Sequence, residues 1–139
     1  MIIKSFWADL ASRYNLEIIY AFGSRSQEIA ALGSGDLKRL PVSSSDLDIG
    51  VKPQPGQHLA TLDKVDLSQE IEEFLSIAKV DLIVLPEADP FLAANIIRGQ
   101  RLYCIDKYQA DEYELYVLRR AGDLAFLERK RQALILERT

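Results

Sequence analysis

Three aspartates lie in stretches of the sequence that otherwise read as apolar strands. Asp46 and Asp48 stand two residues apart in SDLDIGV, and side chains two apart on a strand point to the same face. Asp81 lies inside KVDLIVL, where an aspartate has poor strand propensity and is costly to bury alone. If these two strands are neighbours, we expect the three carboxylates to converge.

Converging carboxylates would suit a divalent metal site. Oxygen ligands on rigid strands favour Mg²⁺, with Mn²⁺ as an alternative. Two such ions, about 3.5–4 Å apart, hold the attacking and leaving oxygens in phosphoryl or nucleotidyl transfer. Without a cation, the like charges would raise one another's pKa values. An alternative remains open. Asp46 and Asp48 would then be the exposed positions of a strand that alternates between surface and core, and Asp81 would lie half-exposed at a strand end.

A Gly-Ser-Arg turn follows the apolar run LEIIYAF. Gly23 would let a phosphate approach the backbone closely, and Ser24 would offer a hydroxyl and an N–H at the start of a helix. Ser24 is also a plausible N-cap, and Arg25 could add a charge-assisted contact to a triphosphate. An ordinary turn is the competing interpretation. Walker-type binding is excluded, because no lysine follows in a Gly-Lys-Ser/Thr arrangement.

Hydrophobic periodicity predicts the elements that must position these residues. We expect an α/β (α+β) fold in which helices cover a small mixed sheet of about four strands, in a single domain over 1–139. Residues 110–139 form a C-terminal helical segment of that domain. The predicted strands are 16–22, 45–52, 79–85 and 101–106; the predicted helices are 2–14, 24–32, 59–77 with a break near 66–68, 89–99, and 110 to the end; residues 33–45 are predicted as a loop.

Composition narrows the functional classes. One cysteine, Cys104, excludes an internal disulfide, and with one histidine, His58, it makes a zinc site improbable. We expect Cys104 to be buried in a strand and His58 to lie in a solvent-facing loop. A net charge of −4 gives no reason to expect broad nucleic-acid binding. No apolar run approaches 18 residues and the N-terminus does not resemble a signal peptide, so we expect a cytoplasmic protein without membrane contact.

The C-terminal segment is basic and ends in aliphatic residues. From Arg119 onward there are six Lys/Arg against three acids. Leu134, Ile135 and Leu136 are more apolar than a solvated tail needs. We favour packing of these residues on the domain's own core, and the alternative is a surface for a partner.

The order of these motifs resembles the DNA polymerase beta-type nucleotidyltransferase superfamily. More narrowly it resembles the minimal nucleotidyltransferases, the MNT partners of HEPN proteins in prokaryotic toxin–antitoxin pairs. The resemblance extends from IIYAFGSRS through SSSDLDIGV and KVDLIVL to ANIIRGQRLYCID, which is most of the chain.

The resemblance implies a nucleotidyltransferase that uses Mg²⁺ and a nucleoside triphosphate. By position, Gly23 and Ser24 match the triphosphate-binding turn, Asp46 and Asp48 match the metal-binding aspartates, and Asp81 matches the third carboxylate, a metal ligand and the base for the acceptor hydroxyl. In the antitoxin branch the donor is ATP, and AMP passes to a tyrosine of the HEPN toxin. The chain departs from the family in one respect: the 21 residues 25–45 separate Ser24 from Asp46, a longer spacing than is usual.

Two other functions stay open at this point. An antitoxin-like binding module would neutralise its partner by complex formation alone. A small-molecule acceptor, such as an aminoglycoside, is less favoured because 139 residues leave little room for a substrate domain. The sequence leaves the nucleotide preference and homo-oligomerisation open.

Overall fold

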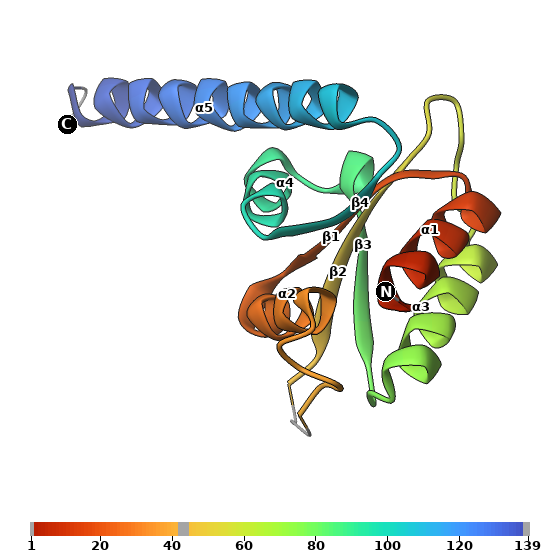
Figure 1. Ribbon diagram of the computed structural model, residues 1–139. Coiled ribbons are helices and arrows are strands. Elements are labelled where there is room, and N and C mark those ends of the chain that lie inside the picture. The colour runs from red at the N-terminus through yellow and green to blue at the C-terminus, as the bar shows by residue number, and fades with distance from the viewer. Residues whose placement is uncertain (1, 42–44, 138–139) are drawn as a thin grey trace.

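Helices cover a four-stranded mixed sheet in the computed structural model, which describes residues 2–41 and 45–137 (Figure 1). This confirms the predicted fold class. Over the described residues the strands are β1 (Leu16–Phe22), β2 (Leu47–Pro53), β3 (Val80–Val84) and β4 (Gln100–Cys104), and the α-helices are α1 (Ile2–Tyr14), α2 (Ser26–Ser34), α3 (Thr61–Leu75), α4 (Pro90–Ile97) and α5 (Lys107–Glu137).

The strand order β3-β2-β1-β4 places the two aspartate-bearing strands side by side. β1 pairs antiparallel with both β2 and β4, whereas β2 and β3 are parallel. A parallel pair needs a crossover connection, and α3 supplies it. The adjacency of the two aspartate-bearing strands, the condition for bringing their carboxylates together, is therefore present.

Helices pack against both faces of the sheet. Alternate residues of β2, Leu47, Ile49 and Val51, are fully buried in a core shared with α1 and α3. The opposite face packs against α4 and the first part of α5 (Figure 1). Gly50 makes close packing possible on that side, because a Cβ there would lie 2.5 Å from Cγ2 of Ile96.

The first half of α5 is fastened to the sheet, and the second half projects beyond it (Figure 1). The Tyr20 hydroxyl donates to Glu114 over 2.7 Å, and the Arg101 guanidinium donates to the same carboxylate over 2.9 Å. At 31 residues the helix is about 46 Å long. Its buried residues, Ala110, Val117 and Ala121, all lie in the first half.

The expectation that the C-terminal aliphatic residues pack on the core is wrong. Leu134, Ile135 and Leu136 are 58 %, 52 % and 73 % exposed. The physical reason is the length of α5, because the helix continues past the edge of the elements that bury its first half. Gly122 does not interrupt the helix, and α5 begins at Lys107 rather than near residue 110.

Two further local predictions are corrected. Ser24 is not a helix N-cap: Gly23–Arg25 form a 3₁₀ turn, and α2 begins after it with Arg25 in the N-cap position. α3 is continuous through residues 66–68, where a break was predicted. Leu67 and Ile71, one helical turn apart, are both buried on the side of α3 that faces the core.

The segment between α2 and β2 is only partly a surface loop. Gly35 ends α2 with φ +89°, a conformation that favours glycine. Leu40 then returns to the core and is 8 % exposed. Residues 42–44 of the predicted loop lie outside the described residues.

The remaining sequence expectations concern isolated side chains. His58 lies exposed in a loop, as predicted. Cys104 is a free thiol at the end of β4 and is half-buried rather than buried. Within the described part of the chain, no helix is both long and apolar enough to cross a membrane.

Candidate active site

The aspartates stand at one end of the β2–β3 pair. In the parallel register Asp48 lies opposite Asp81, so their side chains leave the same face of the sheet. Asp46 stands just before β2, whose first residue, Leu47, donates its N–H to the Lys79 carbonyl over 3.1 Å. The three carboxylates therefore come from one end of two adjacent strands.

Their charges act on one another. Partial burial is the main cause of a raised pKa at Asp48, and the charges of Asp81 and then Asp46 raise this pKa further. Asp46 also faces a cation, because the Lys79 ammonium lies 3.6 Å from its carboxylate. Sequence reasoning missed Lys79, because its position opposite Asp46 follows only from the parallel register of β2 and β3.

The Gly-Ser turn lies directly against Asp48. Phe22, the last residue of β1, is the register partner of Asp48, and Gly23 follows with φ +76°. A Cβ built on Gly23 would lie 2.2 Å from Oδ2 of Asp48. Only glycine fits both the conformation and the space, and the exposed Ser24 is next in the turn. The two halves of the predicted site are thus in contact.

Arg25 is buried rather than presented to solvent beside Ser24. It is 4 % exposed, and its Nε donates to Glu28 over 2.9 Å. Its terminal nitrogens donate to the Pro41 carbonyl over 2.6 Å and to the Ser45 carbonyl over 3.5 Å. Contact between Arg25 and a triphosphate stays a prediction, and it requires the guanidinium to leave these partners. The ion pair between the buried Arg25 and the half-buried Glu28 was also missed from the sequence.

The carboxylates suit a hard divalent cation by chemistry but do not form a closed cage. Across residues 2–41 and 45–137, no group of three or more His, Cys, Asp or Glu is gathered so as to hold a metal ion. Burial raises the pKa of Asp48 most, and the charges of Asp81 and Asp46 add to the rise; a nearby cation would offset the effect of these charges. The all-oxygen donor set fits Mg²⁺ or Mn²⁺, provided that Asp46 turns away from Lys79.

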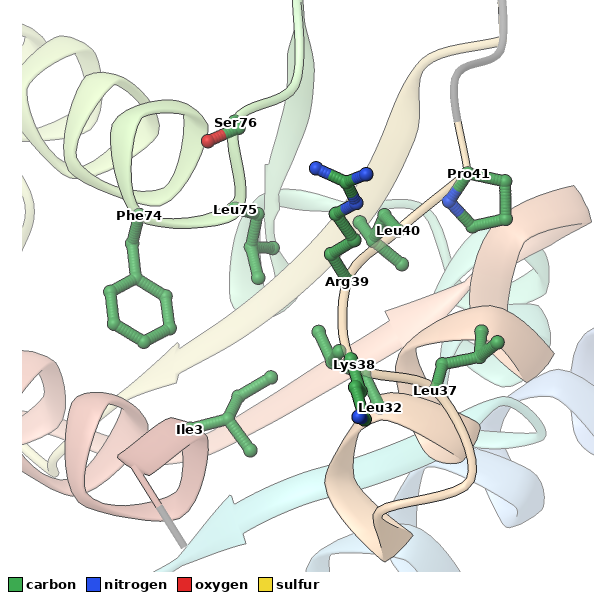
Figure 2. A pocket seen from close by; sticks show the side chains of 10 residues that line it. All are labelled: Ile3, Leu32, Leu37, Lys38, Arg39, Leu40, Pro41, Phe74, Leu75 and Ser76. Carbon is green, nitrogen blue, oxygen red and sulfur yellow. The ribbon is translucent and has the colours of Figure 1, made fainter.

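A cavity of about 950 Å³ lies elsewhere, between α1, the end of α3 and residues 37–41 (Figure 2). None of the three aspartates lines it. The carboxylate end of the sheet and this cavity are therefore separate features.

A carboxylate pair on adjacent strands, beside a Gly-Ser turn, suits phosphoryl or nucleotidyl transfer through a bound divalent ion. Residues 7–108 match the family described as Polymerase beta, Nucleotidyltransferase. The chain belongs to this family. No match was found among curated proteins.

Solved structures with this fold include chains of toxin–antitoxin complexes. One is a complex solved with AMP-PNP, with 25 % identity, 96 % of both chains covered and a TM-score of 0.64. Another is a mutant of the MntA–HpeT toxin–antitoxin, with 24 % identity, the same coverage and a TM-score of 0.64. A third is the tri-AMPylated HEPN toxin of Shewanella oneidensis with its MNT antitoxin, with 23 % identity, 98 % of this chain and 95 % of that chain covered, and a TM-score of 0.61.

Proposed function

We propose that this protein is a Mg²⁺-dependent nucleotidyltransferase that transfers AMP from ATP to a tyrosine of a HEPN-type toxin and so acts as its antitoxin. The observation that carries the proposal is the contact of Gly23 with Asp48, opposite Asp81, on the fold of this family. Structures of similar fold include a toxin–antitoxin with AMP-PNP and a tri-AMPylated HEPN toxin with its MNT antitoxin, which supports the donor and the partner.

Each site residue has a distinct part in the proposed reaction. Gly23 and Ser24 bind the triphosphate, and Asp46, Asp48 and Asp81 hold Mg²⁺. The bound ion would supply charge neutralisation at the transferred phosphate and its leaving group. The acceptor oxygen attacks the α-phosphorus, the bond between the α- and β-phosphates breaks, and pyrophosphate leaves. Asp81 is exposed and accepts the proton of the acceptor hydroxyl.

Label transfer tests this proposal. The protein is incubated with Mg²⁺, ATP labelled on the α-phosphate, and the HEPN-type protein encoded beside it. We expect wild type and Asp66→Asn, which removes an exposed carboxylate on α3, to label the partner equally. Asp48→Asn should reduce labelling by roughly a thousandfold or more, as loss of a central electrostatic group does. Absent labelling by wild type, or full labelling by Asp48→Asn, would refute the proposal.

A second candidate function is neutralisation by binding alone, and α5 favours it. Leu124 and Ile135 follow the buried Val117 by seven and eighteen residues, which returns them to nearly the same side of a 3.6-residue helix. The side of α5 that packs on α4 thus continues as an exposed stripe in which Leu124 and Ile135 flank the Glu128–Arg131 ion pair, and the described part of this chain does not cover it. Such a stripe suits a helical partner such as a HEPN-type protein.

The two candidates differ in one variant. If the double substitution Asp46→Asn/Asp48→Asn abolishes AMP transfer but still relieves the partner's toxicity in cells at equal expression, binding suffices. If toxicity returns while the complex still forms, transfer is required.

A further inference from the structure

We propose that the cavity between residues 37–41 and helices α1 and α3 is a second ligand site, which takes a small amphipathic anion with an apolar body and a carboxylate, phosphate or sulfonate group. This site is separate from the proposed nucleotide site and does not depend on the proposed function. The segment that forms one wall lies within the long spacing between Ser24 and Asp46.

The walls of the cavity are mainly aliphatic and aromatic. Side chains from three helices and the 37–41 segment line the cavity (Figure 2); the apolar ones include Ile3, Leu32, Leu37, Leu40, Phe74 and Leu75. Phe74 is 39 % exposed and stacks on Phe6 with ring centroids 3.9 Å apart, which gives the cavity a rigid aromatic edge. A volume of about 950 Å³ lies within the usual range of small-molecule sites, roughly 300–1,000 Å³.

Two cations line the same cavity. Lys38 and Arg39 are exposed, and within the described residues neither has an ion pair or hydrogen bond. Figure 2 shows the Arg39 guanidinium extended on the side of the cavity that faces Ser76. A guanidinium presents paired donors to a carboxylate, phosphate or sulfonate. These side chains therefore favour an anionic group on a ligand whose body lies against the apolar walls.

Helix capping does not account for the two cations. The Gly35 N–H donates to the Leu32 carbonyl over 3.3 Å at the end of α2. At the end of α3, the Ser76 and Ile77 N–H groups donate to the carbonyls of the preceding turn over 3.4 and 3.0 Å. The last turns of both helices are thus capped by backbone groups, so Lys38 and Arg39 are not required for that purpose.

The wall that carries the cations is held at its far end. Leu40 is buried in the core shared with α1 and α3. Its neighbour Pro41 accepts a 2.6 Å hydrogen bond from the buried Arg25. The wall therefore cannot close onto α3 without breaking these contacts, and the cavity is a preformed site.

A matched pair of dyes tests the proposal on the full-length protein. Anilinonaphthalene sulfonate carries the anionic group, and N-phenylnaphthylamine is the same scaffold without it. We expect Lys38→Gln/Arg39→Gln to weaken sulfonate binding roughly tenfold, a loss of about 1.4 kcal/mol, and to leave the neutral dye unchanged. The control Arg129→Gln/Lys130→Gln removes two cations from α5, near its exposed apolar residues, and should change neither affinity.

Amide chemical shifts locate the bound dye. Perturbations should gather at 37–40 and 74–76, and phenyl phosphate should displace the sulfonate dye where inorganic phosphate does not. Unchanged sulfonate affinity in the Lys38→Gln/Arg39→Gln protein, perturbations confined to α5, or displacement by inorganic phosphate alone would each overturn the proposal. Circular dichroism checks that the substituted proteins remain folded.

Discussion

Gly23 sets how closely the Gly-Ser turn can approach Asp48. Its backbone is left-handed and its missing side chain leaves room for a carboxylate. Any other residue must both strain the backbone and displace Asp48. The close contact between the turn and Asp48 therefore depends on the absence of a side chain at residue 23.

Gly23→Ala is expected to lose AMP transfer by about a hundredfold or more, because a displaced reacting group is costly. The left-handed backbone alone should cost about 1–2 kcal/mol of stability. Gly35→Ala is the matched control: its φ of +89° is similarly unfavourable, yet nothing lies within 4 Å of its Cβ position. Label transfer and urea unfolding measure both effects. Equal loss of activity in the two variants would contradict the role of the Asp48 contact.

Asp48 should make the stability of the protein depend on pH. Burial and the neighbouring carboxylates raise its folded pKa above the unfolded value of about 3.9. The folded state then binds this proton more tightly than the unfolded chain, so this residue lowers the free energy of unfolding as pH rises from about 4 through the folded pKa.

Asp48→Asn is therefore expected to raise the Tm at pH 7 without divalent cations, and the gain should vanish below about pH 4. Mg²⁺ should raise the Tm of wild type more than that of the variant. Differential scanning calorimetry across pH, with and without Mg²⁺, measures both, with Asp66→Asn as the control. A variant less stable than wild type at pH 7 would contradict the argument.

At the scale of the elements, the segment between α2 and β2 is held in part by one buried side chain. Arg25 binds Glu28 and the carbonyls of Pro41 and Ser45 from a buried position. A lysine keeps the charge but lacks the branched donors of a guanidinium. The segment is thus fastened by the residue that directly follows Gly23 and Ser24.

Arg25→Lys is expected to lower the free energy of unfolding by about 1–3 kcal/mol, since a single ammonium cannot reach all three acceptors and leaves at least one of them unpaired. Arg13→Lys is the control, because Arg13 pairs with Asp9 and Glu70 from a position 45 % exposed and should cost less than about 1 kcal/mol. Urea unfolding compares the two. Similar losses would show that burial of Arg25 adds nothing.

The strands and their aspartates could be predicted because the signal is local. Each apolar run is bounded by turn residues, and two-residue alternation places Asp46 and Asp48. Lys79 could not be found in this way, because its pairing with Asp46 depends on parallel register between strands separated by a helix. The same holds for Arg25, whose direction follows from the 3₁₀ turn that replaces a simple helix start.

The exposure of the end of α5 was also beyond local prediction. The local sequence of an aliphatic helix end is the same whether or not other residues cover that end. Whether the end of α5 is buried depends on how far the sheet and the other helices extend beside it, which is a property of the whole fold.

At the level of the whole molecule, the carboxylates and α5 belong to opposite ends of the sheet. Asp48 pairs with Phe22, the last residue of β1. Cys104, three residues before α5, pairs with Ile18, near the start of β1. Figure 1 shows α5 extending from the end opposite the β2 start. We therefore expect substitutions to change nucleotide affinity and partner affinity independently.

Leu134→Asp/Ile135→Asp is expected to weaken partner binding by about a hundredfold or more, as loss of a central apolar contact does, with ATP-analogue affinity unchanged. Asp48→Asn should weaken binding of the ATP analogue and leave partner affinity unchanged. The combined variant should lose both affinities, each by the amount seen in the corresponding single variant. Leu62→Asp, at a 75 % exposed leucine on α3, is the control. Titration calorimetry measures both affinities. A fall in nucleotide affinity on substitution of α5 would contradict the separation.

The bonds of Arg25 also have a thermodynamic consequence. The same guanidinium adjoins the Gly-Ser turn in sequence and holds the wall of the cavity through Pro41. We therefore expect a ligand that moves that wall to affect the turn through Arg25, and a nucleotide bound at the turn to affect the wall. Linkage makes this coupling reciprocal, with one factor governing both directions. The long spacing between the halves of the active site would then act as a heterotropic connection, through which occupancy of one site adjusts affinity at the other.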